Sequence, residues 1–349
     1  MYIRFIKFTR IILFHFVIFF CGSCNDIQPD KDLFKGKDKK LFSTCFVADS
    51  AFMRYPFRVK KMDSDIIISD LHGSEFYCHR FSYPQLQLKQ SFAARGNGPL
   101  EYLDVENIRF NSRGKVFVLD ANKSMITGID INNTEQVHQI ILEKKLMRTL
   151  DFDLMNDSLL IVPDYSGNNR LCIINNQGII VDRLFKIPTK AKTKSSNNTV
   201  VSQAWRSFLD YNPQNGILAM VTQLGHVVEI YNMNSKSIVK IVYGSSGEPV
   251  FIDKGAYAVP NGIMGYSDVQ VGQNKIYALF WGRTFKDIRT KPDITEGGNM
   301  LEVYDLQGNP LYRYILDKYV TGFCVDEKDN TMLALDINSN KPLIAYTLL

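Results

Sequence analysis

The amino-acid sequence predicts an all-β protein, a six-bladed β-propeller made of four-stranded antiparallel blades. A short apolar strand that follows a polar turn recurs six times, at intervals of roughly 50 residues. Almost no stretch has the 3.6-residue apolar period of an amphipathic helix. Strand repeats of this length are typical of propeller blades set around a channel. The six recurrences lie at residues 65–70, 115–120, 158–164, 216–221, 275–280 and 331–336.

Further strands follow in step with these six. A strand that ends in Asn, Asp or Gly, the residues that hairpin turns favour, begins at Thr127, Leu171, Val228 and Leu301. Another β-rich run follows each turn. The two dozen strands implied exceed those of a β-sandwich, and an up-and-down barrel has no such period. Six blades fit best, with five or seven as alternatives.

The last unit predicts how the ring closes. Residues 321–326, 332–336 and 343–348 supply three strands, after which the sequence stops. The fourth strand is expected from residues 43–48, which have a suitable composition. An N-terminal strand in this position would cover an edge that otherwise stays unpaired. A single propeller domain is therefore expected over residues 43–349.

The N-terminus predicts export. Three basic residues and no acid precede an apolar run over residues 11–20, interrupted only by His15. This pattern is typical of a signal peptide, here residues 1–23, and the run is shorter than the roughly 20 residues of a membrane-spanning helix.

Gly22-Ser23-Cys24 resembles the end of a bacterial lipobox, which makes Cys24 the expected lipid-anchored first residue of the mature chain. Cys21 stands where a leucine is usual, so a secreted form without lipid is the alternative. The polar residues 24–42 are expected to form a flexible tether.

The amino-acid composition limits the classes of partner that the protein is expected to bind. The formal net charge is +5, and three of the positive charges lie in the first ten residues, so the remaining chain is nearly neutral. A nucleic-acid partner is therefore not expected. The cysteines of the expected domain are scattered among apolar neighbours and lack metal-ligand spacing, which favours buried free thiols over disulfides. They are Cys45, Cys78, Cys172 and Cys324.

Three stretches carry a family resemblance: Arg95-Gly-Asn-Gly-Pro-Leu-Glu101, Ile276-Tyr-Ala-Leu-Phe-Trp-Gly-Arg283, and Leu301-Glu-Val-Tyr-Asp-Leu-Gln-Gly-Asn309 followed by Val325-Asp326. These stretches resemble the TolB-like, NHL-like six-bladed propeller lipoproteins of Gram-negative bacteria. Leu100 replaces a usual glycine and Trp281 a usual serine. The resemblance implies a binding role in the periplasm or at the cell surface, and a lipid anchor in the cell envelope, at the outer membrane.

Six larger or polar residues interrupt otherwise regular units and form the candidate binding patch. At a channel mouth such side chains stack on a sugar or pair with a carboxylate. Their alternative role is packing or a charged rim. The six are Trp205, Arg206, Gln223, His226, Trp281 and Arg283.

Other features favour structural roles. Residues 96–101 form a turn rather than a phosphate cradle, because Pro99 removes a backbone donor and no helix follows. Acids recur at equivalent positions at the ends of repeated strands. This recurrence favours a structural role in turns over a metal site, which would occur once and interrupt the repeat. These acids are Asp70, Asp120, Asp164 and Asp336. Residues 186–198 predict a solvated basic loop, whereas the apolar loop at residues 254–265 is expected to contact something.

The expected function is non-enzymatic binding of a peptide, protein or glycan by a monomer without a cofactor. The alternative is a metal-dependent propeller hydrolase of the lactonase type, with Ca²⁺ held on the axis by carboxylates. No catalytic residue is assigned, because the sequence has neither a zinc-type histidine spacing nor a Gly-x-Ser-x-Gly motif. Three or more acids that converge on one axial point would favour the hydrolase.

Overall fold

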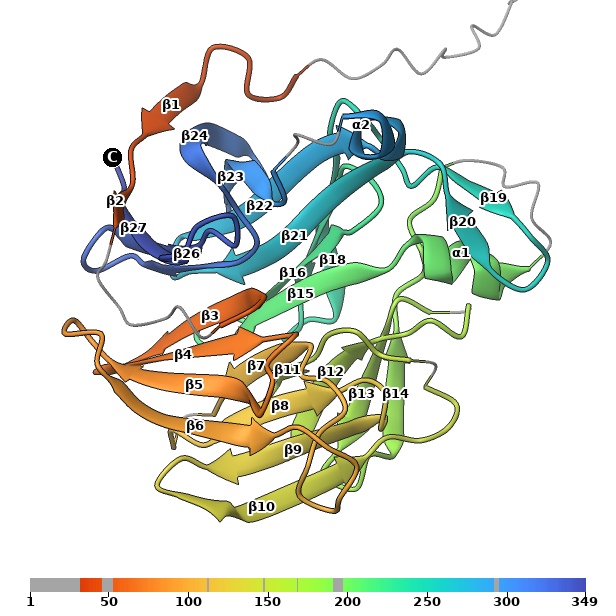
Figure 1. Ribbon diagram of the computed structural model, residues 1–349. Helices are drawn as coiled ribbons and strands as arrows, with labels where there is room; N and C mark the ends of the chain where they lie inside the picture. Colours follow the sequence, from red (N-terminus) through yellow and green to blue (C-terminus); the bar gives the residue numbers. More distant parts are fainter. Residues whose placement is uncertain are drawn as a thin grey trace, which may run out of the picture.

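The computed structural model describes residues 32–45, 53–111, 113–146, 148–167, 169–190, 197–291 and 295–349. Their strands form six blades around a central axis (Figure 1). The predicted signal peptide and Cys24 lie outside the described residues. Neither described helix has the length and apolar character of a membrane span.

Blades one to three follow the chain in order, with each blade running from its inner to its outer strand. Blade one is β3 (Pro56–Met62), β4 (Asp65–Asp70), β5 (Phe76–Ser82) and β6 (Leu88–Ala94). Blade two is β7 (Asn107–Phe110), β8 (Val116–Asp120), β9 (Met125–Asp130) and β10 (Asn133–Ile141). Blade three is β11 (Asp153–Leu154), β12 (Leu159–Pro163), β13 (Leu171–Asn175) and β14 (Ile180–Leu184).

Blades four to six carry the additions to the basic plan. Blade four is β15 (Ser207–Asn212), β16 (Ile217–Thr222), β17 (Val227–Asn232) and β18 (Ser237–Tyr243). Blade five is β21 (Ile263–Val271), β22 (Lys275–Thr284), β23 (Gly298–Asp305) and β24 (Pro310–Val320), with β1 (Asp38–Leu41) outside them. Blade six is β25 (Phe323–Asp326), β26 (Thr331–Leu335), β27 (Leu343–Thr347) and β2 (Thr44–Cys45).

Three short elements lie outside the blades. Helix α1 (Asn198–Ala204) precedes blade four, and α2 (Phe285–Thr290) follows β22. A separate hairpin of β19 (Phe251–Asp253) and β20 (Ala258–Pro260) connects blades four and five.

The strand predictions are confirmed. Each of the six recurring apolar stretches is the second strand of a blade, and β2 pairs antiparallel with β27 to complete blade six. Six clusters of buried apolar side chains, each shared by two neighbouring blades, follow one another around the ring. Three of the cysteines lie in these clusters as buried free thiols: Cys78, Cys172 and Cys324.

The expected flexible tether at residues 24–42 differs from the structure in its described part. Strand β1 pairs in parallel with β24. Phe34 is buried and packs edge-on against Tyr304, while Arg313 binds both Asp32 and Asp38. Phe34 and Arg313 therefore hold this segment against blade five. The prediction of a flexible tether rested on its polar composition, which does not reveal these two contacts.

Candidate functional site

The inner strands β3, β7, β11, β15, β21 and β25 lie side by side around the axis. Their side chains place charges of both signs in the channel. The cations are Arg58, Lys60 and Arg109, and the acids are Asp151, Asp153, Asp210 and Asp268.

Each axial acid has a cation near it. Arg109 lies 3.2 Å from Asp151 and 3.1 Å from Asp153, and it also donates to the carbonyl of Leu209 at 2.6 Å. Burial raises the pKa of Asp153 to about 7, against the opposing effect of the Arg109 charge. Over the described part of the chain, no group of three or more His, Cys, Asp or Glu is arranged to hold a metal ion.

The axial acids also join consecutive blades. Asp151 accepts the backbone N–H of Leu209 at 2.8 Å, Asp210 accepts that of Val271 at 2.7 Å, and Asp268 accepts that of Phe323 at 3.2 Å. In each case an acid of one blade binds the inner strand of the next blade. These carboxylates are therefore occupied in holding the ring together.

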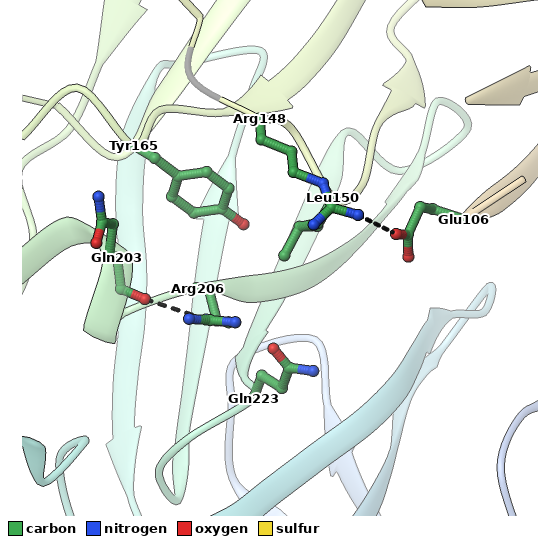
Figure 2. A pocket seen from close by; sticks show the side chains of 7 residues that line it. All are labelled: Glu106, Arg148, Leu150, Tyr165, Gln203, Arg206 and Gln223. Atoms are coloured by element: carbon green, nitrogen blue, oxygen red, sulfur yellow. Dashed lines mark hydrogen bonds and ion pairs between the residues drawn. The ribbon is translucent and has the colours of Figure 1, made fainter. Parts of the chain in front are cut away.

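A cavity of about 380 Å³ opens at the end of the channel where the inner strands begin, which we call the entry face. Its walls come from blades two, three and four and from α1 (Figure 2). Its lining residues are Glu106, Arg148, Leu150, Tyr165, Gln203, Arg206 and Gln223.

Two arginines of this cavity differ in their partners. Arg148 lies 3.2 Å from Glu106, whose pKa burial raises and Arg148 lowers in part. Arg206 donates through Nε to the carbonyl of Gln203 at 3.2 Å, and no carboxylate of the described residues pairs with it (Figure 2). The Arg206 guanidinium is thus a cation in a cavity with unused donors.

Neutral polar groups surround Arg206. Gln223 has a buried Oε1 atom without a hydrogen-bond partner among the residues that the structure describes. Burial raises the pKa of Tyr165 to about 12, so its hydroxyl keeps its proton at neutral pH. The side chain of Gln203 lines the same cavity. Arg206 suits an anionic group of a ligand, and the Gln223 oxygen, which is an acceptor, suits an N–H or O–H donor beside that group.

Helix α1 positions the wall that carries Gln203 and Arg206. Its N-cap, Asn197, accepts the backbone N–H of Thr199 at 3.0 Å. The apolar side of the helix packs into one cluster with Trp205 and the hairpin residue Ala258. Because the apolar side of α1 packs into this cluster, the side chains of Gln203 and Arg206 point toward the cavity (Figure 2).

The candidate patch is divided by the structure. Arg206 and Gln223 line the cavity, whereas Trp205 is 1% exposed and packs beneath α1. His226 is buried, lies 3.0 Å from Glu302 and stacks on Phe280.

Trp281 and Arg283 lie at the end of β22 in blade five and do not line this cavity. Arg283 instead donates to the carbonyl of Thr295 and covers the ring of Tyr319.

Four polar lining residues were absent from the sequence prediction: Glu106, Arg148, Tyr165 and Gln203. Glu106, Arg148 and Tyr165 belong to separate loops or strand ends, and none of them breaks a recurring pattern. Gln203 alone had a usable signal, since it is three residues from Arg206 on helix α1, which interrupts the run of strands.

The predicted turns are confirmed. Glu101 accepts the backbone N–H of Gly98 at 2.7 Å, which closes the turn at residues 96–101. Each of the four strand-ending acids accepts a backbone N–H from the turn that follows it. The apolar loop at residues 254–265 contributes β20, which packs on α1, while Tyr257 is exposed.

Comparison with known proteins agrees with this architecture. A family model described as TolB-like 6-blade propeller-like matches residues 34–328. No curated protein matches the chain.

Solved structures share the fold at low identity. A putative exported protein from Bacteroides fragilis is 10% identical with a TM-score of 0.54, over 88% of this chain and 98% of that chain. A DUF4221 family member from Bacteroides vulgatus is also 10% identical with a TM-score of 0.54, over 89% and 96%. Virginiamycin B lyase from Staphylococcus aureus is 14% identical with a TM-score of 0.51, over 88% and 99%. At these identities the likeness concerns the fold alone.

Proposed function

This chain belongs to the TolB-like six-blade propeller family, and on that premise we propose that it is a binding module. Its ligand is a carboxylate-bearing group of a peptide, protein or glycan, which enters the cavity at the entry face. Binding on a rigid ring of blades, by residues from loops and strand ends, is a common use of such scaffolds.

The observation that carries this proposal is the state of Arg206. Its side chain lines a cavity of about 380 Å³, and among the described residues its Nε donates to the carbonyl of Gln203 at 3.2 Å. A guanidinium binds a carboxylate through two parallel N–H donors, in a geometry that an ammonium does not offer. The side chains of Gln203 and Gln223 then offer neutral hydrogen bonds to polar groups beside the bound acid.

Glu106 and Arg148 have a different role in this proposal. Arg148 pairs with Glu106 and also lies 3.6 Å from Asp104, whereas Arg206 has no carboxylate partner among the described residues. Glu106 also repels a second acid from that side. The arrangement therefore favours a ligand whose carboxylate points toward blade four.

The test is equilibrium binding of the purified protein to two polyanions, poly-L-glutamate and polygalacturonate, with poly-L-glutamine and dextran as neutral counterparts. We expect at least one polyanion to bind and both neutral polymers to fail. Arg206→Gln should weaken the binding by about tenfold or more, because it removes a charge-assisted pair.

Arg283→Gln is the matched control, since it removes the same charge from the same face at a site outside the cavity. Equal losses in the two variants would mean general electrostatic attraction and would contradict the proposal. So would the failure of both polyanions to bind.

We also propose that the protein is exported and anchored in the cell envelope, at the outer membrane, by a lipid on Cys24. The support is the basic and apolar N-terminus followed by Gly22-Ser23-Cys24. Metabolic labelling with a fatty-acid analogue should label the wild-type protein and leave Cys24→Ser unlabelled. Equal labelling of both would contradict the anchor.

A further inference from the structure

Arg58 is a completely buried arginine on β3 with too few partners for its charge. It is 0% exposed, and among the described residues its side chain makes one hydrogen bond, from Nη1 to the carbonyl of Phe57 at 3.3 Å. Its Nε and Nη2 atoms have no hydrogen-bond partner among the described residues. The Asp268 carboxylate is 3.8 Å from Nε and already accepts two backbone N–H groups. A buried charge in this state lacks the compensation that burial requires.

The two other buried arginines of the described chain are better paired. Arg109 lies within 3.2 Å of two carboxylates and donates to two carbonyls and an amide oxygen. Arg170 binds Glu229 with three contacts between 2.6 and 3.1 Å. The fold thus supplies carboxylate partners where a buried arginine has a purely structural role, and it leaves Arg58 without a close one.

Arg58 is the third residue of β3, the inner strand of blade one, and therefore lies toward the entry face. Its guanidinium packs over the ring of Phe208, 4.7 Å from the ring centre, and Phe208 is two residues from Arg206. Its charge lowers the pKa of the cavity residue Glu106, against the larger effect of burial. The position is therefore within electrostatic reach of the cavity.

Two other buried polar atoms without partners belong to the same end of the channel. They are Oε1 of Gln223 and Oγ of Ser267, in the described part of the ring. Gln223 lines the cavity, and its backbone carbonyl accepts the N–H of Gly265, two residues before Ser267. The Ser267 hydroxyl can donate to an anion, whereas Oε1 of Gln223 is an acceptor and can bind only a donor group of a ligand.

We propose that Arg58 forms an anion-binding subsite on the propeller axis beneath the entry-face cavity, which takes a carboxylate or another small monovalent anion. The anion supplies the acceptors that Nε and Nη2 lack. It is either a free solute or an acid group of the ligand in the cavity. The subsite exists independently of the cavity ligand, so it goes beyond the proposed function.

The test is thermal unfolding of the purified protein in increasing sodium formate, with the ionic strength kept constant by sodium gluconate, whose anion is larger. A saturable rise of the midpoint by about 2–4 °C is expected at saturating formate, because formate binds only the folded state. Arg58→Met should abolish the rise, and Arg206→Gln should retain it. No saturable rise, or the same rise in Arg58→Met, would overturn the subsite.

A crystal grown in sodium bromide provides a second measurement that does not depend on the folding of Arg58→Met. We expect an anomalous peak within hydrogen-bonding distance of Nε or Nη2 of Arg58, and a crystal without that peak would overturn the subsite.

Competition separates the two sources of the anion and keeps the tests of the two sites distinct. If the anion is an acid group of the cavity ligand, formate weakens poly-L-glutamate binding. If it is a free solute, the formate response is present and poly-L-glutamate binding is unchanged by formate. Both results support the subsite, and the formate response does not require that any polyanion binds.

Discussion

Arg170 and Arg206 are neighbours in space, and their surroundings are opposite. Arg170 is fully buried, pairs with Glu229 at 2.6 Å and also binds Ser207, the residue next to Arg206. Arg206 lines a cavity and has no carboxylate partner in the described chain. The buried Arg170 thus has a carboxylate partner, and the cavity residue Arg206 has none among the described residues. A carboxylate partner therefore distinguishes an arginine with a structural role from one whose charge is available to a ligand.

A second pair repeats the structural half of this comparison one blade further on. Arg170 directly precedes β13 and binds Glu229 of blade four, whereas His226 directly precedes β17 and binds Glu302 of blade five at 3.0 Å. Each glutamate also accepts the hydroxyl of a tyrosine two residues later, Tyr231 or Tyr304. Blades three, four and five are thus joined by two equivalent buried pairs, one with arginine and one with histidine.

The largest expected effect comes from breaking the arginine pair. Glu229→Gln should lower the free energy of unfolding by about 3–5 kcal/mol, because it leaves the Arg170 charge buried and uncompensated. Denaturant unfolding measures the change. The double variant Arg170→Met with Glu229→Leu should recover most of the loss, since neither charge remains. A loss below about 1 kcal/mol in Glu229→Gln would contradict a structural role for the pair.

The histidine pair should contribute less and should depend on pH. Burial raises the pKa of Glu302, but His226, Tyr266 and Tyr304 together bring it below its ordinary value of 4.5. The stabilisation from this carboxylate is therefore complete above pH 4.5 and is lost as the pH falls further. His226→Leu should cost about 1–3 kcal/mol at pH 7, and the cost should shrink toward pH 3. A cost that is independent of pH would argue against the ionised Glu302.

The axial residue Asp153 should change stability with pH in the opposite direction to Glu302. Burial raises its pKa from 3.8 to about 7, so between these values the folded state holds a proton that the unfolded state has lost. Its contribution to stability therefore falls as the pH rises from 4 to 7, by at most about 1.4 kcal/mol per pH unit. Asp153→Asn should flatten this part of the stability profile. Identical profiles for wild type and Asp153→Asn would disprove the raised pKa.

The smallest expected effect on stability belongs to Arg206. Arg206→Gln should change the free energy of unfolding by no more than about 0.5 kcal/mol, because no buried partner is left unpaired. Denaturant unfolding of this variant beside Glu229→Gln completes the comparison. A loss as large as that of Glu229→Gln would place Arg206 among the structural charges.

The sequence could predict the blades because each strand signals itself locally. The stretches 217–221 and 276–280 have apolar runs and turn residues that need no distant information. Ring closure followed from counting strands in the last unit, and β2 confirms it. The entry-face cavity could not be predicted in the same way, because Glu106, Arg148 and Gln223 come together only when three blades close on one another.

The burial of candidate residues was also beyond the sequence. Trp205 and Arg206 are adjacent and both interrupt the repeat, but one packs beneath α1 and the other lines the cavity. His226 carried the same signal and lies in a buried pair. A residue that breaks a repeat can therefore be recognised in the sequence, but whether its side chain points into the core or into the cavity depends on the packing around it.

The most direct test of the central claim is a crystal structure of the protein in complex with a triglutamate peptide. We predict that a carboxylate of the peptide accepts two hydrogen bonds from the Arg206 guanidinium inside the entry-face cavity, with the pair of Glu106 and Arg148 intact. A peptide bound at another surface while Arg206 stays unoccupied, or an empty cavity at saturating peptide, would contradict the account.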